Sequence, residues 1–287
     1  MISKETIGSL IMPVNTDIKI SSVILSDENK EKLKIFITEM NHRDELVKHG
    51  LRPINKLLFY GASGTGKTYL SKALSNYLGY TMLYVDIAKA LSDNSVAQNI
   101  SDIFEAARQL EKCIIFLDEC DSITLSRYTS EYGDTSQVRR ATNSLFQQLD
   151  QMQPKTVFIA ATNLLFKIDP AFERRMDLKF EFRRPSSDLK PTIERFMHEG
   201  FELLDDVDET TSDIVAKRAE RYTKLSYAEI QNIVERAMKR AVIDNSMVVR
   251  TSEIFSDLAK TMGIKMKFGT DVEPDEAFTR PKDNINN

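Results

Sequence analysis

A glycine-rich stretch over residues 61–68 has the residue types needed to hold a chain of phosphates. It reads Gly-Ala-Ser-Gly-Thr-Gly-Lys-Thr. Its three glycines allow backbone angles that a side chain would forbid, so successive N–H groups can turn inward around an anion. The Lys67 ammonium can reach the β- and γ-phosphates, and the Thr68 hydroxyl is a hard oxygen suited to Mg²⁺. The stretch therefore predicts a site for a nucleoside triphosphate and Mg²⁺.

The residues on either side predict a strand before this loop and a helix after it. An apolar run, residues 57–60, leads in, and a helix-compatible run, residues 69–74, leads out. Strand, loop and helix in this order are the context that a P-loop requires, and a helix N-terminus adds N–H donors and partial positive charge. The alternative, a glycine-rich turn that matches by chance, does not explain both flanks. The predicted nucleotide-binding residues are Gly61, Ala62, Ser63, Gly64, Thr65, Gly66, Lys67, Thr68 and Tyr69.

Two adjacent carboxylates follow an apolar run some fifty residues later. Asp118 and Glu119 come directly after residues 113–117, Cys-Ile-Ile-Phe-Leu. A carboxylate at a strand tip can hold a metal, and a second one can polarise a water for attack on the γ-phosphate. The alternative is a pair of solvated turn charges. Because a P-loop precedes them, we assign Asp118 to the metal and Glu119 to catalysis.

Asn163 ends the next predicted strand, residues 156–162. An uncharged amide there can hydrogen bond to the γ-phosphate or orient the attacking water without adding negative charge. Asn is also a common turn residue at strand ends, so this position alone leaves both interpretations open.

Arg174 and Arg175 follow a short helix start at residues 169–173. A guanidinium suits the charge that develops on a phosphoryl group in transfer, and it can be supplied by a neighbouring subunit. The alternative is a solvated basic turn, or ion pairs with Glu173 and Asp177.

Strand and helix patterns alternate through the first two thirds of the chain, which predicts an α/β fold with a parallel sheet covered on both faces. In such a sheet, ligands lie beyond the carboxyl ends of the strands, where the candidate residues fall. A helix with its N-cap at Ser26 or Asp27, ending near Gly50, precedes the first strand of this pattern. Residues 188–262 have helical patterns alone. We expect an irregular arm over 1–22, the α/β domain over 23–185, a helical domain over 186–268 and a polar, disordered tail over 269–287.

Composition excludes several other classes. Hydrophobic residues make up 41% of the chain and the net charge is −4, so the composition gives no support to a general nucleic-acid-binding surface. No apolar run approaches the roughly 18 residues that cross a bilayer, and residues 1–6 lack the build of a signal peptide, so we expect a cytoplasmic protein. Cys113 and Cys120 are expected to be reduced and buried. The three histidines, His42, His49 and His198, have no metal-ligand spacing.

Taken together, these motifs resemble the AAA ATPases of the AAA+ superfamily, in particular compact bacterial members with one ATPase module. The resemblance covers about residues 24–245 and includes Ala161-Thr162-Asn163, residues 138–145 and residues 225–230. It implies a P-loop sheet of order 5-1-4-3-2, a C-terminal helical lid over 186–268, and Mg²⁺-dependent hydrolysis of ATP. It further implies a homo-oligomeric ring, usually a hexamer, that acts on a partner protein.

The resemblance assigns roles by position. Lys67 and Thr68 match the Walker A pair, Asp118 and Glu119 match Walker B, and Asn163 matches the first sensor. Arg174 and Arg175 match the arginine fingers that reach a neighbour's ATP. Residues 22–25 fall where the family contacts adenine.

The chain departs from the family pattern at two places. Residues 91–95, Leu-Ser-Asp-Asn-Ser, lack the aromatic residue and glycine with which family remodellers line the pore and grip an unfolded chain. The arginines are adjacent, without the intervening Pro-Gly, so one of them is not expected to reach across. Ala228 stands where many AAA+ branches have a sensing arginine, which agrees with the AAA branch.

Two functions of different classes follow, a ring that remodels or regulates a partner protein and an assembly switch gated by ATP. The missing pore aromatic favours the switch. A DNA-associated loader is the weakest alternative, since the chain has no basic stripe.

Overall fold

The computed structural model describes residues 11–14, 16–85, 96–110, 112–124, 135–185, 189–207, 225–261, 265–266 and 278–279. The chain divides into two compact units, Met1–Phe182 and Arg183–Asn287, and each is described by itself.

The first unit is built on a six-stranded sheet in the part of the chain that the structure describes, with the order β1-β3-β4-β5-β2-β6. The strands are β1 (Ile11–Val14), β2 (Lys56–Gly61), β3 (Thr81–Val85), β4 (Cys113–Leu117), β5 (Thr156–Thr162) and β6 (Leu178–Phe182). All neighbours pair in parallel except β1 and β3, which are antiparallel. Numbered from the phosphate-loop strand, the parallel strands have the predicted order 5-1-4-3-2. The α/β P-loop fold is therefore confirmed.

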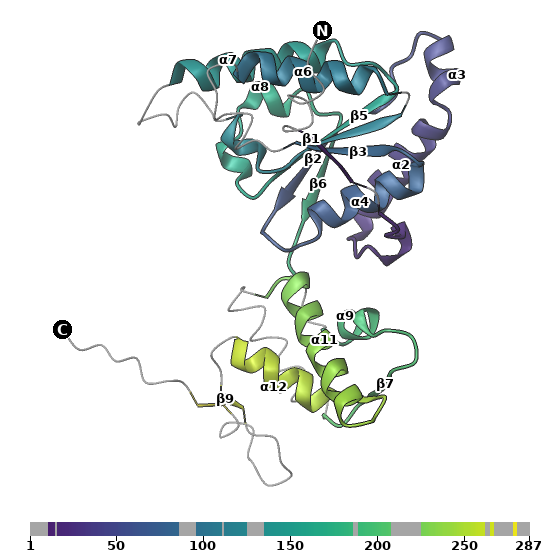
Figure 1. Cartoon of the computed structure of the whole chain (residues 1–287), viewed down its shortest axis with the longest axis vertical. Coiled ribbons are helices and arrows are strands. Elements are labelled where there is room, and N and C mark those ends of the chain that lie inside the picture. The colour runs from purple at the N-terminus through teal and green to yellow at the C-terminus, as the bar shows by residue number, and fades with distance from the viewer. Residues whose placement is uncertain are drawn as a thin grey trace, which may run out of the picture. The chain divides into compact units, whose positions relative to one another are not determined.

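Helices cover both faces of this sheet (Figure 1). They are α2 (Asp27–Asn41), α3 (Arg43–Lys48), α4 (Lys67–Leu78), α6 (Val96–Arg108), α7 (Thr135–Asp150) and α8 (Pro170–Glu173), with the short 3-10 turns η1 (Ile20–Ser22), η2 (Cys120–Ser122) and η3 (Leu165–Lys167). Side chains from α6 and α7 pack with one face of the strands, and those from α2 and α4 pack with the other. Every residue of β4 and β5 is buried as a result, which explains why these strands are apolar without alternation.

The helix predicted to run from Ser26 or Asp27 to near Gly50 begins as expected and is broken once. The Ser26 hydroxyl accepts a hydrogen bond of 3.3 Å from the Asn29 N–H and so caps α2. At His42 the backbone leaves the helical region, and α3 begins one residue later. The Arg43 guanidinium is buried and donates to the Tyr80 hydroxyl. The contact between Arg43 and Tyr80 gives a reason for the break between α2 and α3. Helical periodicity in the sequence does not predict this contact.

The arm expected to be irregular over 1–22 contains a strand, and that expectation was wrong for residues 11–14. β1 pairs with β3 from Ile11 opposite Val85 to Val14 opposite Met82. The run is apolar, and Pro13 within it has no N–H to donate to a ladder. An edge strand tolerates proline, since one of its sides has no ladder to complete.

The second unit contains α9 (Lys190–Phe196), α11 (Tyr227–Ile243) and α12 (Thr251–Thr261) around a common apolar core. A capping box begins α11, in which Ser226 and Glu229 satisfy each other's backbone N–H groups. The expectation of helices alone was wrong, because β7 (Glu202–Leu204) and β8 (Val248–Arg250) form a short parallel pair. Three-residue strands are too short to produce a recognisable pattern. In the expected tail, the described residues are β10 (Phe278–Thr279), which pairs with β9 (Lys265–Met266); the rest lies outside the described residues.

Both cysteines are buried and free, as predicted. Burial raises the pKa of the Cys113 thiol to about 11 and raises that of Cys120 further above its ordinary value. Neither thiol is therefore ionised at neutral pH, and both act as small apolar side chains.

Candidate nucleotide-binding site

The glycine-rich loop connects β2 to α4 with backbone angles that need glycine. Gly61, Gly64 and Gly66 have φ values of 141°, 71° and 104°. The Thr65 hydroxyl donates to the Ala62 carbonyl over 2.7 Å and closes the loop. Gly66 caps α4 without a side-chain hydrogen bond, so the N–H groups of the first turn keep their donor capacity. The loop therefore has the form of an anion cradle at a helix N-terminus.

Gly61 is also fixed by a neighbouring strand. A Cβ atom at this position would lie 2.0 Å from the Phe182 carbonyl oxygen of β6. The close approach of β6 to the start of the loop thus excludes any side chain there, a constraint independent of phosphate.

The Lys67 side chain folds back onto this loop. Its Nζ donates to the Gly61 and Ala62 carbonyls over 2.8 and 2.7 Å, and to Asn163 Oδ1 over 2.7 Å. The residue is buried, and burial lowers the pKa of the ammonium while the nearby Asp118 carboxylate opposes that shift. The structure thus brings together the predicted cation at the start of α4 and the predicted amide that follows β5.

Asp118 and Thr68 form the second half of the site. The Thr68 hydroxyl lies 3.3 Å from Asp118 Oδ2, and the Tyr84 hydroxyl lies 3.4 Å from the same oxygen. A hydroxyl and a carboxylate on adjacent elements are hard oxygen ligands of the kind Mg²⁺ takes together with phosphate oxygens and water. The donor set therefore fits the ion. No cluster of three or more His, Cys, Asp or Glu side chains with metal-binding geometry occurs in the described parts of the chain.

Tyr84 was not identified from the sequence. Its position in an apolar strand suggested only a β-former, and its contact with Asp118 depends on how β3 and β4 pair. The one signal available was a hydroxyl-bearing residue near the carboxyl end of β3.

Glu119 follows with an unusual backbone. Its φ of 49° is left-handed, and its N–H donates to Asp118 Oδ1 over 3.0 Å. The side chain is exposed. A non-glycine residue in this conformation is costly and is found mostly where a side chain must be aimed. The catalytic role of the Glu119 carboxylate stays a prediction.

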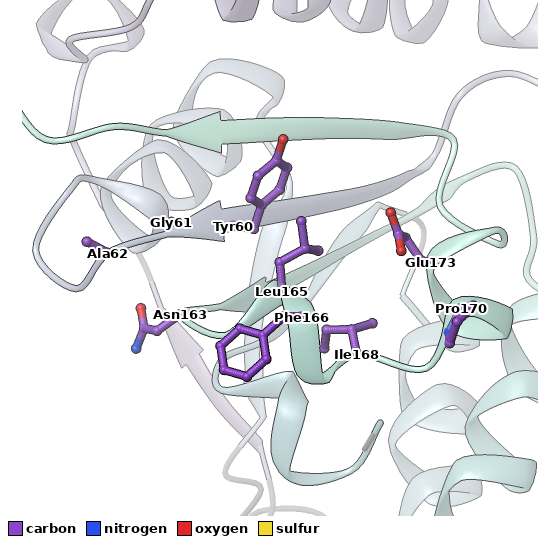
Figure 2. Close-up of a pocket in the computed structure, with 9 residues that line it drawn as sticks. All are labelled: Tyr60, Gly61, Ala62, Asn163, Leu165, Phe166, Ile168, Pro170 and Glu173. Atoms are coloured by element: carbon purple, nitrogen blue, oxygen red, sulfur yellow. The ribbon is translucent and has the colours of Figure 1, made fainter. Parts of the chain in front are cut away.

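A cavity of about 700 Å³ adjoins the phosphate loop. Its lining residues are Tyr60, Gly61, Ala62, Asn163, Leu165, Phe166, Ile168, Pro170 and Glu173. Figure 2 shows Ala62 and Asn163 at one end of this cavity and Pro170 and Glu173 at the other. The loop and the amide thus border open space that a phosphate group or its water can enter.

The two arginines have different environments. Arg175 donates to both carboxylate oxygens of Asp150 over 3.0 and 3.1 Å, and its guanidinium lies 4.4 Å from the Phe146 ring centre. The Arg174 side chain is exposed and has no hydrogen bond or ion pair with any residue that the structure describes. The alternative ion pairs with Glu173 and Asp177 do not form, because Glu173 pairs with Lys179 and Asp177 accepts from the Asn55 and Lys56 N–H groups.

Residues 20–25 pass close to the start of α4. The Ser22 hydroxyl lies 2.9 Å from the Tyr69 hydroxyl in the first turn of that helix. The expected adenine contact at 22–25 stays a prediction. The expected pore segment, residues 91–95, lies outside the described residues.

The sheet order and the phosphate loop together define a P-loop nucleoside triphosphatase. The profile of the family described as "ATPase family associated with various cellular activities (AAA)" matches residues 57–184. The chain is 32% identical over 232 residues to "Uncharacterized AAA family ATPase y4kL" from Sinorhizobium fredii, which covers 80% of this chain and 67% of that protein. It is also 32% identical over 234 residues to "26S proteasome regulatory subunit 6B homolog" from Dictyostelium discoideum, which covers 79% of this chain and 55% of that protein.

The chain therefore belongs to the AAA family and is an ATPase. It spans about two thirds of the length of the first relative and just over half of the second. In the described part of the chain, no helix has both the length and the apolar character to cross a membrane.

Proposed function

We propose that the chain hydrolyses ATP as a homo-oligomeric ring, most simply a hexamer, and uses the cycle to remodel or regulate a partner protein. The observation that carries the proposal is the hydrogen bond from Lys67 to Asn163 beside the Thr68–Asp118 pair. These contacts gather four candidate residues at the carboxyl edge of the sheet, where α/β proteins bind ligands.

The nucleotide-binding residues have distinct roles in this proposal. The loop N–H groups and Lys67 hold the triphosphate, and Asn163 contacts the γ-phosphate. Thr68 and Asp118 would hold Mg²⁺, which when bound neutralises charge on the phosphate oxygens. Glu119 accepts a proton from the attacking water, while the bond from the γ-phosphorus to its bridging oxygen breaks and ADP leaves.

A neighbouring subunit completes the site. Arg174 is exposed and has no partner among the described residues, so it can meet the phosphates of an adjacent copy without giving up a contact. Arg175 is bound to Asp150 within its own subunit. We therefore assign the finger to Arg174, and assign Arg175 to holding the end of α8 in place.

The partner in this proposal is another protein. The proteasome subunit homologue is named for an assembly, which supports action on other proteins. An ATP-gated assembly switch without threading is the second candidate, and it is favoured by the absence of an aromatic residue and a glycine in residues 91–95. A DNA-associated loader has the least support, since the net charge is −4. The cytoplasmic location stays a prediction.

Dilution of the purified protein in saturating ATP and Mg²⁺ tests the ring. Turnover per subunit should fall as the oligomer dissociates, with the oligomer followed by light scattering. Full turnover by a monomer would exclude the shared site. A pulling assay on an unfolded model chain then separates the two candidates, since brisk hydrolysis without translocation supports the switch and translocation supports the remodeller.

A further inference from the structure

The side chain of Thr162 joins the two turns that carry Glu119 and Asn163. Thr162 ends β5 and is 1% exposed. Its hydroxyl donates to Asp121 Oδ1 over 2.7 Å and accepts from the Leu164 N–H over 2.9 Å. Asp121 lies in η2, two residues after Glu119, and Leu164 directly follows Asn163. One buried hydroxyl therefore connects both turns.

This connection lies beyond the last residue pair of the ladder between β4 and β5, where one backbone hydrogen bond, from the Asp169 N–H to the Thr124 carbonyl over 2.8 Å, also joins the two segments farther along. The register of β4 with β5 ends at the pair Leu117 and Ala160. Beyond that pair, the turn after β4 carries Glu119 and the end of β5 leads to Asn163. The hydrogen bond between Thr162 and Asp121 continues the link between the two chain segments past the last backbone pair.

The turn that Asp121 belongs to contains the left-handed Glu119. A residue in this conformation persists only where its surroundings hold it. The Asp118 carboxylate accepts from the Glu119 N–H, and the Glu119 carbonyl accepts from the Ser122 N–H over 3.0 Å. Both contacts are local to the turn. The bond from Thr162 is a contact that ties this turn to the strand before Asn163.

We infer that Thr162 and Asp121 are positioning residues that fix the Glu119 carboxylate relative to the Asn163 carboxamide. The inference rests on the proposed function, because it takes Glu119 as the base and Asn163 as the γ-phosphate contact. The role inferred for both residues is indirect, because they act on the two turns and not on the nucleotide. Loss of their bond lets the two turns separate, which misplaces the base without changing how the phosphate loop holds ATP. Misplacement of about 1 Å is enough to cost roughly 100-fold in rate.

The test is Thr162→Val, which keeps the shape of the side chain and removes its hydroxyl. We expect kcat for ATP hydrolysis to fall roughly 10- to 100-fold, with KM and the dissociation constant for ADP within about twofold of the parent. Thr162→Ser keeps the hydroxyl and should recover kcat to within about threefold. Thr156→Val is the matched control, since Thr156 is buried at the opposite end of the same strand. An unchanged kcat in Thr162→Val, or an equal loss in Thr156→Val, overturns the inference.

Asp121→Ala removes the acceptor of the same hydrogen bond. It replaces Thr162→Val as the test if that variant does not fold. It should reduce kcat to the same degree, and the double variant should be no slower than either single variant, because both remove one bond. Losses that multiply in the double variant overturn the inference. Glu119→Gln in the same assay distinguishes a failure of the positioning role from a failure of the proposed function. If it abolishes turnover while Thr162→Val does not alter it, only the positioning role fails; if it leaves turnover unchanged, the proposed function fails.

Discussion

The Nζ atom of Lys67 lies 2.7 Å from Oδ1 of Asn163. The cation at the start of α4 is therefore hydrogen bonded to the amide that follows β5. A triphosphate entering the loop must exchange this bond, and the bonds from Lys67 to Gly61 and Ala62, for bonds to phosphate oxygens. In the proposed function, the binding of ATP and the approach of Asn163 to the γ-phosphate therefore involve the same ammonium.

Lys67→Ala should abolish tight ATP binding. Each charge-assisted hydrogen bond from the ammonium to phosphate contributes roughly 1.5–3 kcal/mol, so loss of two weakens affinity by about 100-fold or more. Titration with a fluorescent ATP analogue measures this. Lys72→Ala removes the same charge from the same helix and should bind normally. Near-parental affinity in Lys67→Ala would contradict the assignment of the phosphate loop.

Affinity for ATP should also fall as the pH rises. Burial lowers the pKa of Lys67 below the ordinary lysine value of 10.5, so in the free protein the ammonium loses its proton at a lower pH than an exposed lysine does. The neutral amine attracts phosphate less, and the dissociation constant should therefore begin to increase below pH 10.5. Titrations between about pH 7.5 and 10 test this. Lys67→Arg stays charged over that range, and an equally steep decline in that variant would show that another group is responsible.

Glu119→Gln should bind ATP and fail to cleave it. The amide keeps the size of the side chain but cannot accept the proton of the attacking water, which costs roughly 10²- to 10⁴-fold in kcat. Retained nucleotide is measured by filter binding, and the oligomer by gel filtration in ATP. We expect ATP to accumulate on the protein and the oligomer to become more stable. Unchanged turnover would place the base elsewhere.

The motifs and the parallel sheet could be predicted because each rests on local sequence. The glycine spacing at 61–66 predicts the loop that precedes Lys67. The apolar run at 113–117 predicts the strand that precedes Asp118. Contacts between residues far apart in the chain leave no comparable pattern in the local sequence. The different environments of Arg174 and Arg175 could not be predicted from two adjacent, identical residues, because the difference depends on Asp150, which lies 25 residues before Arg175 in the chain.

The short strands could not be predicted from the sequence for a related reason. Three residues of β7 and three of β8 hold no period, and their pairing joins segments more than forty residues apart. Pro13 is compatible with β1 only because this strand lies at the edge of the sheet, and its edge position depends on pairing with β3. The contact between Thr162 and Asp121 likewise depends on the neighbouring ends of β4 and β5.

The two arginine variants should separate catalysis from stability. Arg174→Ala removes a side chain with no described partner, so it should leave the melting temperature unchanged while hydrolysis falls about 10³-fold or more, the scale of an arginine finger. Arg175→Ala breaks the paired contact with Asp150 and the stacking on Phe146, so it should lower the free energy of unfolding by about 1–2 kcal/mol. Asp150→Asn should reproduce much of that loss in stability.

Mixing tests whether the sites are shared. Subunits with Lys67→Ala have an intact Arg174 but a phosphate loop that does not bind ATP tightly. Subunits with Arg174→Ala have an intact phosphate loop but no finger. A mixture of the two variants should recover part of the ATPase activity if one subunit supplies the finger to the next. If the mixture stays as inactive as its components, while an affinity tag on one variant co-purifies the other, sharing of sites between subunits loses its support.

Gly61→Ala and Gly66→Ala should destabilise the protein to different degrees, although both residues have positive φ. At Gly66 an added Cβ meets no atom within 4 Å, so the cost is backbone strain of about 1–2 kcal/mol. At Gly61 the same atom would lie 2.0 Å from the Phe182 carbonyl oxygen, and β6 must move away from β2. That displacement disturbs the contact between the Phe182 and Phe59 rings, whose centres are 5.3 Å apart, so we expect a loss of about 3 kcal/mol or more. Urea denaturation followed by circular dichroism measures both variants. Equal losses would mean that strain in the loop, and not the approach of β6, is what requires glycine at the start of the phosphate loop.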